Sequence, residues 1–349
     1  MAAPINLCLV WAIFFFCNCN SLPSFPSILI FGDSLVDTGN NNYIKTILKA
    51  KYLPYGQDYP GNLPTGRFSN GKLIPDILAS ALGIKDSVPP FLDPTLSEHD
   101  LITGVNFASA GAGFDDLTTT LSNAIQVSKQ IELFKVYVEK LKGIVGEGKA
   151  KEIINGALVI LNAGTNDWLL NYYDIPTRKL QFNATGYRDF LLNDKLQIFI
   201  TELYELGCRR MVVSGLPPIG VIPFQMKTVK LENPLAGESW LEDQNRDSGV
   251  YNEELVKLLT RLQATLPGTK LVYNDLYEPV MDMITQPDKY GYVETKKGCC
   301  KSTILLCHPL ASTCKSPSKF LFWDMIHPTF TSNQYLVKYI LKNVIPKFL

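Results

Sequence analysis

Five short apolar runs, spaced along most of the chain, predict the strands of a buried sheet. Each run holds four to six residues rich in isoleucine, leucine or valine. Continuous apolar runs of this length are typical of parallel strands that are covered on both faces. The runs are Ser27–Phe31, Gly104–Ala108, Ala157–Asn162, Met211–Ser214 and Lys270–Asn274.

Between these runs, apolar residues recur at spacings of three and four, which predicts amphipathic helices. One stripe runs from Val127 to Val145, and a second runs from Leu192 to Leu206 and ends at Gly207. A third stripe, 251–266, is stopped by Pro267 and the glycine after it. Strands that alternate with helices predict an α/β fold, here a three-layer α/β/α sandwich around a mostly parallel five-stranded sheet.

Polar or small residues follow the first three apolar runs. Ser34 follows the first run, Gly111 the second and Asn166 the third. In open α/β sheets, ligands bind beyond the carboxyl ends of the strands. We therefore expect these three residues to meet at one edge of the sheet and to form part of a site.

Composition and charge narrow the class of protein. Lysine and arginine together number 33, and aspartate and glutamate also number 33. This balance provides no electrostatic field for binding nucleic acid or an anionic membrane. The length and the apolar fraction suit one large α/β domain, or two at most.

The N-terminus carries an uncharged apolar segment at residues 7–17. A bilayer-spanning helix needs about 20 residues, so this segment is too short to span a membrane comfortably. It is interpreted as the core of a signal peptide, with a buried helix as the alternative. We expect residues 1–22 to be removed, with cleavage somewhere within 19–25, which predicts a secreted mature chain without an integral membrane segment. Asn183 begins an Asn-Ala-Thr sequon and is the candidate glycosylation site.

The cysteines fit an oxidising compartment. Cys299, Cys300, Cys307 and Cys314 form a cluster, whereas Cys208 stands alone and is expected to be a buried free thiol. Zinc binding is the alternative for the cluster, because a histidine follows Cys307 directly. The cluster lacks a paired C-x-x-C and follows a secretory signal, so two disulfides are expected, with three possible pairings.

A serine, a histidine and an acid together supply the minimum chemistry for nucleophilic acyl transfer. Ser34 lies in Phe-Gly-Asp-Ser-Leu directly after a strand run, although a turn or cap serine is the alternative. Of the three histidines, only His327 has an aspartate, Asp324, three residues before it. A carboxylate there can orient the imidazole that takes the serine proton. His99 lies in an acidic stretch and is expected to be solvated, and His308 lies in the cysteine cluster.

The same chemistry needs hydrogen-bond donors for the oxyanion of the tetrahedral intermediate. Gly111 lets a backbone N–H approach closely, with Gly113 as its neighbour, and Asn166 offers a side-chain donor. Alternatively, these residues serve only the local turns. The glycine-rich stretches match neither a phosphate loop nor a dinucleotide fingerprint, and neither a metal nor a cofactor is expected.

Four ordered blocks resemble the plant-type GDSL esterase/lipase family within the SGNH hydrolases. They are FGDSL at 31–35, the run 103–113, the run 157–167 and Asp-Met-Ile-His at 324–327. Further matching stretches lie at 54–56, 64–71 and 322–324, so the resemblance covers nearly all of the chain after residue 26. It implies the flavodoxin-like SGNH fold over a single hydrolase domain, residues 23–349.

The resemblance also implies roles for individual residues. Ser34 matches the catalytic serine, and Asp324 and His327 match the block that supplies the other triad members. Gly111 and Asn166 match the oxyanion residues, with Ala110 replacing a glycine that is common before Gly111.

The expected function is therefore a secreted serine hydrolase that cleaves carboxylic esters through an acyl-enzyme. Its partner is a small-molecule or polymer-borne ester, such as an acyl lipid or an acylated polysaccharide. Two alternatives remain: an acyltransferase that uses the same site, and a catalytically silent binding or defence protein on the same scaffold.

Overall fold

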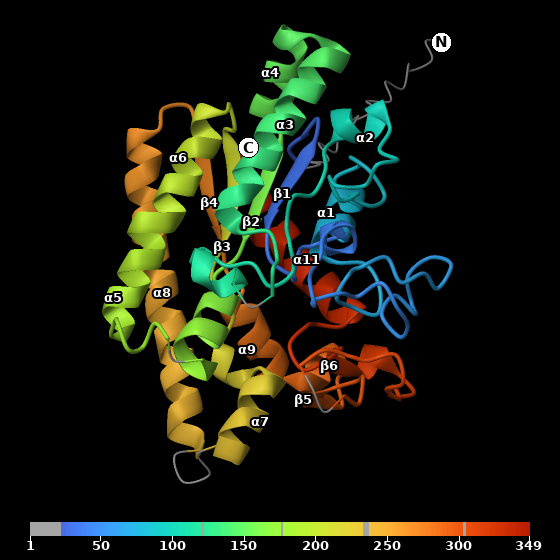
Figure 1. Cartoon of the computed structure of the whole chain (residues 1–349), viewed down its shortest axis with the longest axis vertical. Coiled ribbons are helices and arrows are strands. Elements are labelled where there is room, and N and C mark those ends of the chain that lie inside the picture. Colours follow the sequence, from blue (N-terminus) through green and yellow to red (C-terminus); the bar gives the residue numbers. More distant parts are fainter. Residues whose placement is uncertain (1–21, 121, 176, 233–236, 303–304) are drawn as a thin grey trace, which may run out of the picture.

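A computed structural model describes residues 22–349 of the chain, except 121, 176, 233–236 and 303–304. Its main sheet has four parallel strands in the order β1-β2-β3-β4 (Figure 1). They are β1 (Ile28–Gly32), β2 (Leu158–Asn162), β3 (Arg210–Ser214) and β4 (Lys270–Asn274). Four of the five predicted strands are thus confirmed, and all are parallel. The candidate signal peptide, 1–22, lies almost wholly outside the described residues.

The prediction of a fifth strand at Gly104–Ala108 is wrong. This segment runs beside β1 and makes only isolated bridges, one of them between Ile30 and Asn106. It still donates two backbone hydrogen bonds to β1, from the Phe107 N–H to the Ile30 carbonyl at 2.8 Å and from the Ser109 N–H to the Gly32 carbonyl at 3.0 Å. The ladder is interrupted at Gly32, because its N–H donates to the Gln130 Oε1, 2.8 Å away, and not to a carbonyl of this segment.

The two faces of the sheet are both covered by helices, which confirms the three layers. Along β1, alternate side chains point to opposite faces. Leu29 and Phe31 belong to the hydrophobic cluster that includes α3 (Val127–Val145), α6 (Gln197–Glu205) and α8 (Gly237–Thr265). The alternate residues Ile28 and Ile30 belong to the cluster formed with α1 (Ile74–Ala81), α9 (Tyr277–Thr285) and α11 (Phe330–Asn343).

The three predicted helical stripes are all helical. The first coincides with α3, and the third lies in α8, which begins much earlier, at Gly237. The second begins as a π-helix, Phe190–Leu196, and continues as α6. A second π-helix covers Asp167–Asp174. The remaining α-helices are α2 (Glu98–Thr103), α4 (Glu147–Gly156), α5 (Ala184–Asp189), α7 (Pro223–Glu232) and α10 (Pro287–Tyr290).

A small second sheet carries the cysteine cluster near the C-terminal end of the chain. It pairs β5 (Glu294–Gly298) with β6 (Phe320–Phe322) in parallel. Cys299 is bonded to Cys314, and Cys300 to Cys307, which confirms two disulfides and selects one of the three pairings. Cys208 is a buried free thiol, as predicted. Within the described residues, no helix is both long enough and apolar enough to cross a bilayer.

Candidate active site

Ser34 lies in the turn that directly follows β1. The turn begins at Gly32, whose φ of 139° and close approach to the Asn162 carbonyl leave no space for a side chain. The Asp33 N–H donates to the same carbonyl at 3.0 Å, which ties the turn to the end of β2. Ser34 is 7% exposed, so the turn presents its hydroxyl from an almost closed site.

Asp324 and His327 lie in a tight loop that follows β6. The loop is closed by the Trp323 N–H, which donates to the His327 carbonyl at 2.7 Å. The Asp324 Oδ1 accepts the backbone N–H groups of Ile326 and His327 at 2.8 and 2.7 Å. The backbone therefore fixes the carboxylate and the imidazole relative to each other.

Ser34, His327 and Asp324 form one hydrogen-bonded chain. The distance from the Ser34 Oγ to the His327 Nε2 is 2.8 Å, and that from the His327 Nδ1 to the Asp324 Oδ2 is 2.7 Å. Since a carboxylate only accepts, Nδ1–H donates to Asp324 and Nε2 accepts the serine hydroxyl. Asp324 and His327 are both buried. The structure thus brings together the three residues that the sequence singled out.

Asn166 lies just beyond β2 and lines the same cavity as Ser34. Its Nδ2 donates to the Ala112 carbonyl at 2.9 Å, which leaves the second hydrogen of the amide for another acceptor. Gly111 precedes Ala112 in a turn with a φ of 86°. Among the described residues, the backbone N–H groups of Ser34 and Gly111 donate to no protein acceptor. Gly111 is buried and does not line the cavity itself.

Three buried carboxyl groups organise these turns. Asp37 accepts the N–H groups of Gly39, Asn40 and Ala110, and Asp167 accepts those of Phe114 and Asp115. The last of the three, Asp33, accepts the N–H of Leu35 at 3.0 Å.

Burial is the largest influence on the titration of these three acids. It raises the pKa of Asp33 to about 7, that of Asp37 to about 6 and that of Asp167 to about 7, although hydrogen bonds from backbone N–H groups oppose the rise. Negative charge from Asp167 and Asp37 raises the pKa of Asp33 further. The three acids therefore titrate near neutral pH, and one of them, Asp33, lines the cavity at Ser34.

A mostly apolar cavity opens at Ser34. Its polar end is formed by Asp33, Ser34, Thr165 and Asn166, and its walls come from both the sheet edge and the helices around it. The apolar lining includes Ile74, Pro217, Pro218, Ile222, Leu276, Val280, Phe322, Ile326 and Leu336. Such a cavity can hold a hydrocarbon group beside the hydroxyl.

The other candidate residues lie apart from this site. His99 is exposed on α2, as expected for a solvated residue. His308 lies in the bridged segment, where its Nδ1 accepts the Leu310 N–H at 3.2 Å. Asn183 is exposed at the N-cap of α5, where its Oδ1 accepts the Gly186 N–H.

The sequence reasoning missed several residues at the site. It assigned no role to Asp33, Asp37 or Asp167, although Asp33 belongs to the FGDSL motif and Asp167 directly follows Asn166. It also gave no role to Tyr55, whose hydroxyl donates to the Asp324 Oδ2 at 2.7 Å. The Tyr55 contact spans 269 residues of sequence, so no local pattern could have revealed it.

An α/β fold with a serine, a histidine and an aspartate linked by hydrogen bonds at the sheet edge has the arrangement of a serine hydrolase. Comparison with known proteins gives the same class. The family model described as GDSL-like Lipase/Acylhydrolase matches residues 28–340, and the chain belongs to this family.

Curated relatives are similar to this chain over almost its whole length. GDSL esterase/lipase At2g30310 of Arabidopsis thaliana is 54% identical over 93% of this chain and 90% of its own length. GDSL esterase/lipase At2g24560, from the same plant, is 51% identical over 93% of this chain and 90% of its own length. The family comprises carboxylic ester hydrolases, so the chain is an enzyme of that class, and the resemblance seen in its motifs is confirmed.

Proposed function

We propose that the protein hydrolyses carboxylic esters with Ser34 as nucleophile, His327 as general base and then general acid, and Asp324 as the residue that orients His327. The observation that carries this proposal is the 2.8 Å contact between the Ser34 Oγ and the His327 Nε2. It supplies an acceptor for the hydroxyl proton at the moment of attack.

In the first half-reaction, the Ser34 Oγ attacks the ester carbonyl while its proton passes to the His327 Nε2. The tetrahedral intermediate collapses when the C–O bond to the alcohol breaks and His327 returns the proton to the leaving oxygen. In the second half, His327 takes a proton from water, whose oxygen attacks the acyl-serine ester. The bond between the acyl carbon and the Ser34 Oγ then breaks, His327 returns the proton to Oγ, and the carboxylic acid is released.

The oxyanion of both intermediates is held by the N–H groups of Ser34 and Gly111 and by the Asn166 amide. The two backbone N–H groups have no protein acceptor among the described residues, and one amide hydrogen of Asn166 remains unused. Donors arranged in advance in a buried site stabilise the developing charge strongly.

The acyl group of the substrate occupies the apolar cavity at Ser34. The lining of aliphatic and proline side chains favours a hydrocarbon chain over a sugar-like group, because an apolar wall offers no partners to hydroxyl groups. The apolar lining therefore indicates that the substrates are esters of carboxylic acids with a hydrocarbon chain. Turnover of p-nitrophenyl esters of graded acyl length tests the assignment, and highest activity toward the acetyl ester would contradict it.

The proposed setting of the enzyme is extracellular. Residues 1–22 form a signal peptide and residues 23–349 a single hydrolase domain, which carries a glycan at Asn183. Two disulfides and an exposed sequon support this setting, because both are typical of secreted proteins.

A substitution and a covalent probe together test the catalytic assignment. Ser34→Ala is expected to abolish hydrolysis of a p-nitrophenyl ester and labelling by a fluorophosphonate, while circular dichroism stays unchanged, because the side chain lies in an edge turn. His327→Ala should be equally inactive, whereas His99→Ala, at an exposed position, should retain full activity. Full activity of Ser34→Ala would refute the nucleophile.

A further inference from the structure

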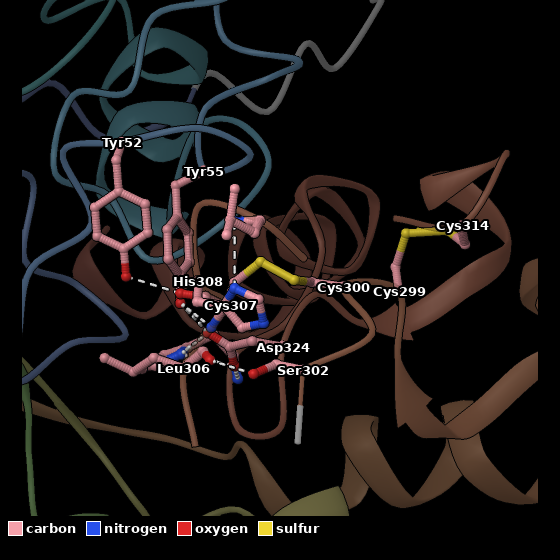
Figure 2. Close-up of a disulfide and its surroundings, with 12 residues drawn as sticks. Tyr52, Tyr55, Cys299, Cys300, Ser302, Leu306, Cys307, His308, Cys314 and Asp324 are labelled. Atoms are coloured by element: carbon pink, nitrogen blue, oxygen red, sulfur yellow. Dashed lines mark hydrogen bonds and ion pairs between the residues drawn. A yellow bond between two sulfur atoms is a disulfide. The ribbon is translucent and has the colours of Figure 1, made fainter. Parts of the chain in front are cut away.

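Two tyrosines from the N-terminal third of the chain contact the bridged cysteine segment beside Asp324 (Figure 2). The Tyr52 hydroxyl donates to the Cys307 carbonyl at 2.7 Å. The Cys307 N–H donates to the Tyr55 hydroxyl oxygen at 3.0 Å, and the Tyr55 hydroxyl donates to the Asp324 Oδ2 at 2.7 Å. A chain of hydrogen bonds therefore links the Cys300–Cys307 disulfide loop to the acid of the triad.

The direction of this chain follows from the groups in it. A backbone N–H can only donate, so the Tyr55 oxygen must accept from Cys307, and its single hydrogen is left for Asp324. Burial, followed by the charge of Asp324, raises the pKa of Tyr55 well above its usual range. The raised pKa keeps the phenol protonated at neutral pH, so it donates to the carboxylate there.

Tyr55 holds the Asp324 Oδ2, the carboxylate oxygen nearer to the imidazole, since the His327 Nδ1 lies 2.7 Å from Oδ2 and 2.9 Å from Oδ1. The Asp324 Oδ1 is held by two backbone N–H groups, those of Ile326 and His327. Among the described residues, the Oδ2 accepts from Tyr55 and from the His327 Nδ1 only. Rotation of the carboxylate is therefore restrained on one side by the loop backbone and on the other by Tyr55.

Aromatic packing fixes Tyr55 in this place. It is fully buried, and its ring meets that of Phe68 edge-on at 5.7 Å between centroids. Phe68 in turn lies 5.1 Å from the His327 ring, so the same loop packs against both the acid and the base.

We propose that Tyr55 is a positioning residue for the Asp324–His327 pair, and that the Cys300–Cys307 disulfide loop sets the place of Tyr55 through the Cys307 N–H. This inference rests on the proposed triad and adds a fourth residue and a covalent anchor to it. Residues that hold a reactive group in its productive geometry are a general requirement of precise active sites.

Loss of the Tyr55 hydroxyl should change two quantities at once. The carboxylate would lose a restraint, so the imidazole would be less well oriented and kcat would fall, while KM would stay nearly unchanged. The carboxylate would also lose a donor that disperses its negative charge. It would then stabilise the imidazolium more strongly, and the acid limb of the pH–kcat profile would move to higher pH.

The test compares Tyr55→Phe with Tyr52→Phe in the whole protein, using a short p-nitrophenyl ester. Both variants remove a hydroxyl bonded to Cys307, but only Tyr55 contacts Asp324. We expect Tyr55→Phe to lower kcat about 10-fold, which corresponds to about 1.4 kcal/mol, and to raise the midpoint of the acid limb. Tyr52→Phe should keep kcat within about twofold of that of the unaltered protein. The midpoint of its acid limb should not move.

Three outcomes would overturn the proposal. Unchanged kcat in Tyr55→Phe would show that the hydroxyl is dispensable. A fall in kcat without movement of the acid limb would make Tyr55 a packing residue only. Equal effects of the two substitutions would assign the loss to the loop as a whole.

A double-mutant cycle tests the covalent anchor. Cys300→Ala/Cys307→Ala is measured alone and combined with Tyr55→Phe. If the disulfide acts through Tyr55, the losses in kcat are not additive, and the combined variant resembles Tyr55→Phe. Additive losses would show that the disulfide does not act through Tyr55. Should the cysteine variant fail to fold, the tyrosine pair still decides whether Tyr55 positions the acid.

Fluorophosphonate labelling separates this inference from the proposed function. If Ser34 is the nucleophile, Tyr55→Phe is still labelled to completion at Ser34, only more slowly. Activity retained by Ser34→Ala would refute the triad itself, whatever the tyrosine variants do.

Discussion

At the scale of single residues, Asn166 joins two turns that come from different parts of the chain. Its Nδ2 bonds to the Ala112 carbonyl, in the turn that contains Gly111, and its side chain lines the cavity at Ser34. A residue in this place can stabilise the local fold, the oxyanion or both. The two roles differ in what their loss would change.

We expect Asn166→Ala to lower kcat by about 100- to 1000-fold, with a smaller change in KM, because removal of one oxyanion donor has a cost of this size. Asn171→Ala is the matched control. Asn171 is also a buried asparagine that bonds across to the segment after Gly111, through Thr118, but it does not line the cavity. Steady-state kinetics of both variants decide the question. An unchanged kcat in Asn166→Ala would show that Asn166 only links the two turns and does not bind the oxyanion.

At the scale of secondary structure elements, prediction succeeded where burial left a clear pattern. The four strands of the main sheet are apolar runs because helices cover both faces, and the runs match the strands to within two residues. The helix α3 coincides with its stripe for the same reason. The segment at 104–108 also looks like a strand, but the side chain of Gln130 accepts the Gly32 N–H that a regular ladder would need, an effect that hydrophobic periodicity does not register.

The small sheet and part of the site could not be predicted from a local pattern in the sequence. The residues of β5 are mostly polar and partly exposed, so no pattern marks them as a strand. Ser34, Asp324 and His327 could be selected because short motifs name them, and the structure brings them together. Tyr55 lies in 54–56, one of the stretches that match the family, but its contact with Asp324 exists only in the folded chain.

The two disulfides should differ in what they stabilise. The Cys299–Cys314 bond closes a 15-residue separation, for which loss of chain entropy in the unfolded state predicts about 3 kcal/mol of stabilisation. We expect Cys299→Ala/Cys314→Ala to lower the free energy of unfolding by about this amount, measured by urea denaturation. Its kcat should change less than that of Cys300→Ala/Cys307→Ala, because only the latter pair includes the residue that contacts Tyr55. A larger loss of kcat in the first pair would contradict this division.

At the scale of the whole molecule, the three buried carboxyl groups link the stability of the fold to pH. Asp33 and Asp37 follow β1, and Asp167 begins the π-helix after β2; burial raises the pKa of each above its value in the unfolded chain. The folded protein therefore binds more protons than the unfolded chain between pH about 4 and about 7. Their contribution to stability is complete below about pH 4 and is lost as the pH rises through about 6 to 7.

We expect Asp33→Asn to flatten this decline, since an amide oxygen can still accept the Leu35 N–H but does not ionise. One such carboxyl contributes a slope of at most about 1.4 kcal/mol per pH unit. The measurement is the free energy of unfolding in urea at several pH values from 4 to 8. Glu98→Gln, at an exposed position on α2, serves as the control and should keep the slope. An unaltered slope in Asp33→Asn would show that Asp33 does not titrate in this range.

The proposed nucleophile and its base are separated by 293 residues of sequence. Ribosomes make proteins from the N-terminus, so Ser34 is synthesised early and spends nearly the whole of translation without His327. The apolar strands that follow can emerge and begin to associate, but the hydroxyl has no imidazole to accept its proton. The nascent chain therefore stays inert toward esters until His327 has been synthesised and has reached Ser34.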